Sequence, residues 1–79
     1  MSLLNLLNDI NPKDEVTKIF ASYEDPMGAA VKWAQNIATS KEIDPNKDQI
    51  VFIRELRRAE PSLNLKSATY LAQMTARAF

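Results

Sequence analysis

The sequence of 79 residues contains no cysteine and no histidine. Without cysteine the chain has no disulfide framework and no thiolate nucleophile, and without histidine it lacks the commonest acid–base group and metal ligand. A single glycine also excludes a Gly-rich phosphate-binding loop. These absences predict that the protein is not an enzyme and that it uses no cofactor and no metal ion.

The chain also has no excess of either charge, since 10 basic and 10 acidic residues give a formal net charge of zero. This balance argues against a general binder of nucleic acids or membrane surfaces. No apolar run approaches the roughly 20 residues that a membrane span needs. The leucine-rich first ten residues lack the basic region and cleavage site of a secretory signal. We therefore expect a cytoplasmic protein without membrane association.

Three Asn-Pro or Asp-Pro pairs are the clearest positive signal, and they stand at Asn11-Pro12, Asp25-Pro26 and Asp44-Pro45. A side-chain oxygen at the N-cap accepts a free backbone N–H, and proline at the first helical position loses no hydrogen bond. Each pair therefore predicts the start of a helix. The predicted helices run from Ser2 to about Asp9, from Pro12 onward, from Pro26 to about Ser40, from Pro45 to about Ala59, and from near Asn64 to the C-terminus.

Apolar residues recur at helical spacing within each of these segments. In the stretch from Pro12, every position of the i, i+3, i+4, i+7 pattern is apolar: Val16, Ile19, Phe20 and Tyr23. Alanine recurs at every fourth position of the third and fifth segments, which predicts that these two helices approach most closely. We expect an all-α fold, a compact bundle of four to five short helices with short loops, with residues 1–79 as a single helical domain.

The stretch from Asp44 to Glu55 resembles an EF-hand calcium loop. The residues at loop positions 1, 3, 5 and 12 are Asp44, Asn46, Asp48 and Glu55. The stretch departs from that pattern at position 6, which is Gln49 instead of glycine, and at position 9, which is Phe52. The alternative interpretation is that Asp44 caps a helix with Pro45 at its first position, and that Asp48 lies near the positive end of this helix. We favour this second interpretation because the other two proline pairs cap helices with no calcium pattern after them.

Basic residues with an interleaved aromatic side chain define a candidate contact surface on the outer faces of the last two helices. Its residues are Lys47, Val51, Arg54, Arg58, Lys66, Tyr70, Gln73 and Arg77. Such a surface suits a partner protein, a nucleic acid or simply solvent. The zero net charge favours a protein. We therefore expect a small protein-interaction module of regulatory, adaptor or inhibitor type, monomeric or homodimeric. The alternative is a nucleic-acid-binding accessory protein that uses the same surface.

Overall fold

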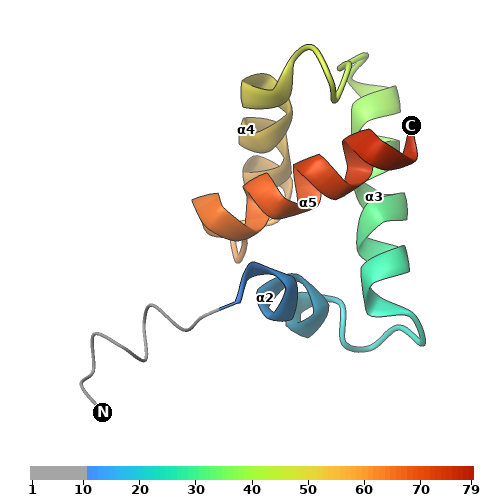
Figure 1. The fold of residues 1–79 in the computed structure, drawn as a ribbon, viewed down its shortest axis with the longest axis vertical. Helices are drawn as coiled ribbons and strands as arrows, with labels where there is room; N and C mark the ends of the chain where they lie inside the picture. The colour runs from blue at the N-terminus through green and yellow to red at the C-terminus, as the bar shows by residue number, and fades with distance from the viewer. Residues whose placement is uncertain (1–10) are drawn as a thin grey trace.

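The computed structural model describes residues 11–79, and in this range the chain forms four α-helices and no strand (Figure 1). The helices are α2 (Pro12–Ile19), α3 (Pro26–Ser40), α4 (Gln49–Ala59) and α5 (Leu65–Ala78). The predicted all-α bundle of short helices joined by short loops is confirmed. The helix predicted from Ser2 to about Asp9 lies outside the described residues. Within those residues, no helix has the length and apolar character needed to cross a membrane.

The core lies where α5 crosses the other three helices (Figure 1). Its largest fully buried apolar side chains are Phe52, Leu56, Leu63, Leu71 and Val16. The alanines spaced four residues apart on α3 and α5 are also buried: Ala30, Ala34, Ala38, Ala68, Ala72 and Ala76. Small side chains there let neighbouring helices approach closely. The prediction that α3 and α5 form the closest pair is too narrow, because α5 contacts α2, α3 and α4 to a similar extent.

Side chains cap the N-termini of α2 and α3, as the sequence predicts. Asn11 Oδ1 accepts a hydrogen bond from the Lys13 amide at 2.9 Å, and Asp25 Oδ1 accepts one from the Gly28 amide at 3.2 Å. Proline is the first residue of both helices, where no backbone N–H is needed. Gly28, the only glycine of the chain, leaves room for the Asp25 carboxylate, because a Cβ at this position would overlap it.

The C-terminus of α3 closes in a Schellman motif built on a residue other than glycine. Glu42 adopts the left-handed backbone conformation, with φ at 54°. The Ile43 amide donates to the Ala38 carbonyl oxygen at 2.8 Å, and the Glu42 amide donates to that of Thr39 at 3.3 Å. These bonds satisfy the last carbonyls of α3 and turn the chain sharply toward α4.

The start predicted for α4 at Pro45 is wrong, because the helix begins four residues later at Gln49. Asp44 Oδ1 accepts hydrogen bonds from the amides of Asn46 and Lys47, so it caps a turn that does not continue as a helix. Pro45 is buried, and the Asn46 side-chain amide donates to the Ala76 carbonyl oxygen at 3.4 Å. This tertiary anchoring on α5 holds the turn in place, and α4 then starts afresh in a new direction.

Tyr23 is predicted to lie on the apolar face of its segment, but it is exposed, and so are Ala59, Leu65 and Phe79. All four lie at or beyond the end of a helix. Ala59 and Leu65 are terminal residues of α4 and α5, while Tyr23 and Phe79 follow the last residue of α2 and α5. Helical spacing assigns a face correctly, but it does not say where the neighbouring helix stops covering that face.

Candidate protein-binding surface on α4

The structure exposes nearly all of the residues predicted for the contact surface. Seven of them are exposed, namely Lys47, Val51, Arg54, Arg58, Lys66, Gln73 and Arg77. Tyr70 is half-buried and packs against the hydrophobic core. Part of its ring is therefore already used in folding, which leaves less of it for contact with a partner.

The predicted surface divides into two faces. α4 and α5 pack against each other, with Phe52 and Leu56 of α4 and Leu71 of α5 buried in the shared core. By helical spacing, Arg54 and Arg58 lie on the side of α4 opposite Phe52 and Leu56. α5 crosses α4 on the core side (Figure 1). The outer faces of the two helices are therefore separate parts of the surface.

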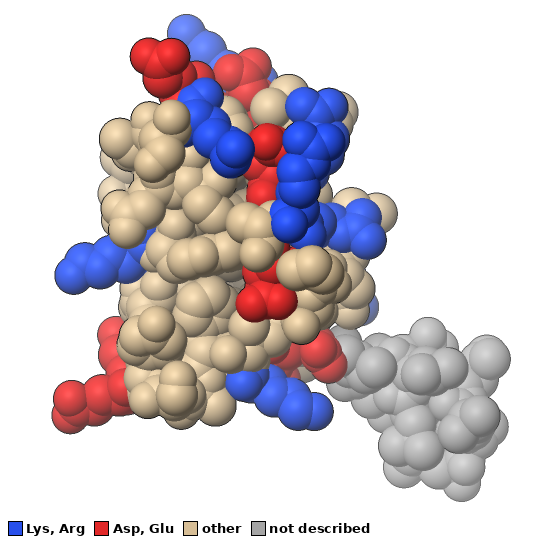
Figure 2. Space-filling model, turned by 180° about the vertical axis from the view of Figure 1, so that it is seen from behind, with Lys and Arg blue, Asp and Glu red and all other residues tan. Residues whose placement is uncertain are grey.

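The outer face of α4 carries exposed aliphatic residues among its cations. Ile50 is 84% exposed and Val51 is 36% exposed. Arg54, Arg57 and Arg58 follow along the same helix and are all exposed. Figure 2, which views the molecule from behind, shows basic side chains over the side that α4 occupies, with acidic side chains between them. The sequence prediction of this surface omits Ile50, although its place one helical turn before Arg54 is a signal that could have found it.

A buried carboxylate lies beside these arginines. The Glu55 side chain is only 10% exposed, and it forms ion pairs with Arg58 at 3.4 Å and with Lys41 at 3.6 Å. Glu55 Oε2, the oxygen nearest Arg58, has no partner with hydrogen-bond geometry among residues 11–79. The Arg58 contact is thus an ion pair without a well-aligned hydrogen bond. Through Lys41, Glu55 also connects α4 with the end of α3.

A small open hollow of about 400 Å³ lies beside Ile50 and Val51 at the start of α4, lined by residues 46–51. The N-cap residue Asp48 makes no side-chain hydrogen bond to the first turn of this helix. Arg57 differs from the other two arginines, since its Nε donates to the Leu63 carbonyl oxygen at 3.4 Å. Arg57 is thus held through its Nε, while its other N–H donors, like those of Arg54 and Arg58, are available to solvent.

The residues of the calcium-loop resemblance do not converge on one point. Asp44 caps a turn through Oδ1, whereas Glu55 is buried and paired with Lys41 and Arg58. Among residues 11–79, no group of three or more His, Cys, Asp and Glu side chains is placed to hold a metal ion. Capping of a turn accounts for Asp44, and ion pairing accounts for Glu55.

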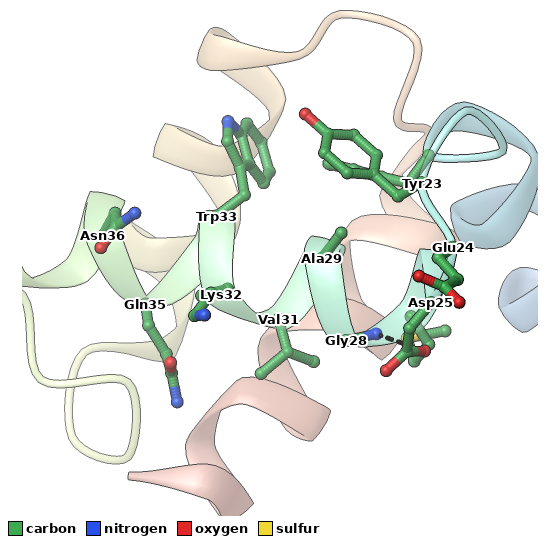
Figure 3. Close-up of a pocket in the computed structure, with 12 residues that line it drawn as sticks. Tyr23, Glu24, Asp25, Gly28, Ala29, Val31, Lys32, Trp33, Gln35 and Asn36 are labelled. Carbon is green, nitrogen blue, oxygen red and sulfur yellow. Dashed lines mark hydrogen bonds between the residues drawn. The ribbon is translucent and has the colours of Figure 1, made fainter.

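A second, larger hollow of about 840 Å³ surrounds the first half of α3. Figure 3 shows that its lining residues lie on both sides of the helix, with Tyr23 and Trp33 on one side and Val31 and Gln35 on the other. The hollow is therefore an open surface around a helix, without the enclosure that usually buries a small ligand. The sequence analysis does not predict this hollow.

Three aromatic rings gather at this second hollow. The Phe20 ring centroid lies 5.5 Å from that of Trp33 and 6.1 Å from that of Tyr23, and both pairs are tilted. These are ordinary distances for aromatic packing. The carboxylate of Asp25, which also lines the hollow, is engaged in capping α3. The cluster therefore contributes to the joint between α2 and α3.

No protein-family model, curated protein or solved structure matches the chain. Its function is therefore inferred from the geometry and chemistry of the described residues.

Proposed function

We propose that the chain is a small protein-interaction module of regulatory, adaptor or inhibitor type, that it catalyses no reaction, and that it works in the cytoplasm. It binds another protein through the exposed outer surfaces of its last two helices, and the outer face of α4 is the main contact. We define the α4 face as Ile50, Val51, Arg54 and Arg58 of α4 together with Lys47, which lies in the turn just before the helix.

The exposure of Ile50 supports this proposal most strongly. Its side chain is 84% exposed, it adjoins the exposed Val51, and the two lie beside a hollow in the surface. Protein interfaces typically combine such an apolar centre with arginine, which is enriched at contact sites. The α4 face holds both kinds of residue on one short helix.

A nucleic-acid-binding accessory protein is the alternative, supported by the exposed cations Lys66 and Arg77 on α5 as well as those on α4. Nucleic acids without a regular duplex are usually held by stacking bases on aromatic rings. The only aromatic residue of α4 is Phe52, which is fully buried, and Tyr70 of α5 is half-buried. The available stacking surface is small, which favours a protein partner.

The proposal is tested by photo-crosslinking in living cells of the source organism. A photoreactive residue replaces Ile50 in the full chain, and a matched control replaces Lys32, which is exposed on α3. We expect a defined protein adduct from position 50, no such adduct from position 32, and loss of the first when Arg54→Glu and Arg58→Glu are added. Equal adducts from both positions, no adduct from position 50, or adducts with nucleic acid alone contradict the proposal.

A further inference from the structure

We propose that the partner presents an acidic helical segment to the α4 face, with one apolar side chain against Ile50 and two carboxylates opposite Arg54 and Arg58. This inference depends on the proposed function and deepens it, because it assigns the chemistry of the partner. It follows from the charge, the spacing and the burial of residues on a single helix.

The charge of the helix points to an acidic partner. The helix α4 contains three arginines and one acidic residue, Glu55. The carboxylate of Glu55 is buried, whereas the arginines are exposed. The chain as a whole has no net charge. Apart from the exposed N-cap Asp48 at its start, the α4 face is a local basic surface on a neutral protein. Such a surface attracts an acidic partner and repels a basic one.

The spacing of the residues points to a helical partner. Ile50, Arg54 and Arg58 stand four residues apart, so they form a row along one side of α4. With a rise of about 1.5 Å per residue, the row is about 12 Å long. A partner helix that carries an apolar residue and then acidic residues four and eight positions later has the same spacing. The exposed side chain of Ile50 is the apolar surface that such an anchor would contact.

The ion pair with Glu55 restricts the Arg58 side chain before a partner carboxylate binds. Glu55 lies 3.4 Å from its guanidinium group and limits where this side chain moves, yet Arg58 is still 72% exposed. Guanidinium has five N–H donors, so an arginine held on one side still offers donors to a second carboxylate. Holding the side chain in advance lowers the entropy cost of binding.

Two other occupants fit the α4 face less well. A second copy of the chain in a symmetric dimer would place Arg54 and Arg58 against the same arginines, and like charges in contact oppose binding. A nucleic acid would satisfy the cations but would leave Ile50 and Val51 in contact with polar phosphate or with water. The acidic helical segment satisfies both the cations and the aliphatic side chains.

The test is an amide NMR titration of the full chain with three synthetic helical peptides. The first carries Leu, Glu and Glu at positions i, i+4 and i+8, the second replaces both Glu residues by Lys, and the third replaces Leu by Ser. A fourth titration uses a mixed-sequence DNA oligonucleotide. We expect the first peptide to shift the amides of Ile50, Val51, Arg54 and Arg58. We expect at least tenfold weaker binding of the Ser peptide and no binding of the Lys peptide. We also expect the first peptide not to bind the Arg54→Glu, Arg58→Glu variant, whose changes are at exposed positions.

Four results overturn the inference: no shift of the α4 amides by the Glu peptide, equal binding of the Glu and Lys peptides, shifts confined to α5, or shifts of the same α4 amides by the oligonucleotide at lower concentration. Failure of the inference is distinguishable from failure of the proposed function. If position 50 captures a protein in cells but the Glu peptide does not shift the α4 amides, the α4 face still binds a protein and only the assigned partner chemistry is wrong. If position 50 captures nothing, the proposed function fails as well.

Discussion

The Arg58 guanidinium lies 3.4 Å from Glu55 Oε2, three residues earlier on α4, and the carboxylate of this pair is buried while the arginine is exposed. Folding therefore removes water from the two charged groups to different extents. Glu55 loses most of its hydration on folding, whereas Arg58 keeps its own. An ion pair of this kind orients the arginine without necessarily stabilising the fold.

Replacing Glu55 by leucine is expected to leave stability unchanged or to raise it by about 1 kcal/mol. The change removes a buried carboxylate whose Oε2 has no hydrogen bond within residues 11–79, and it leaves no buried charge behind, because Lys41 and Arg58 are 49% and 72% exposed. Urea denaturation measures the change, with Glu55→Ala as a control that fills less space. A loss of more than about 2 kcal/mol on Glu55→Leu would show that the ion pairs stabilise the fold.

The substitution Glu42→Gly is expected to stabilise the protein by about 1 kcal/mol. Glu42 has φ at 54° in the Schellman motif that ends α3, and only glycine adopts this conformation without a steric cost. For a domain of this size the gain corresponds to a rise in melting temperature of about 4–8 °C. Thermal unfolding followed by circular dichroism measures it. Glu42→Ala, which keeps the Cβ, serves as the control and is expected to show no gain.

The capping box of α5 is expected to behave as one unit. Asn64 Oδ1 accepts from the Ser67 amide at 2.8 Å, and Ser67 Oγ accepts from the Asn64 amide at 3.0 Å. Asn64→Ala and Ser67→Ala are each expected to cost about 1 kcal/mol. Because each removes part of the same reciprocal arrangement, the double variant is expected to lose less than the sum. Strictly additive losses in a double-mutant cycle would mean that the two bonds act separately.

Ile50 and Phe52 are expected to differ sharply in their contribution to stability. Ile50 is 84% exposed, so Ile50→Ser is expected to change the free energy of unfolding by less than about 0.5 kcal/mol. Phe52, two residues later, is fully buried, and Phe52→Ala is expected to cost about 3–5 kcal/mol. Chemical denaturation of both variants makes the comparison. A large loss from Ile50→Ser would indicate that this side chain supports the fold, and the case for its role in binding would weaken.

The sequence predicted most of the fold because helix starts and apolar faces are local signals. Asn11 and Asp25 cap helices as expected, since an N-cap needs only its own side chain and the next turn. Asp44 has the same local sequence pattern, but its turn does not continue as a helix. Asn46 connects that turn to the backbone of Ala76, 30 residues later. A long-range contact of this kind cannot be predicted from the neighbouring residues in the sequence.

The candidate surface was only partly predictable for a similar reason. Helical spacing correctly placed Arg54 and Arg58 on an exposed face of α4. It did not reveal that α5 crosses on the opposite side, so the residues around Tyr70 form a separate face. It also gave no reason to single out Glu55, whose burial depends on how closely the end of α3 approaches α4.

The central claim is that α4 presents Ile50 to a partner protein, and methyl NMR of the full chain with the crosslinked partner tests it most directly. We predict that the Ile50 methyl resonance shifts when the purified partner is added, while the methyl of Ile19 on α2 stays in place. We also predict that Arg54→Glu with Arg58→Glu abolishes the shift. A partner that binds with the Ile50 methyl unmoved would contradict the claim.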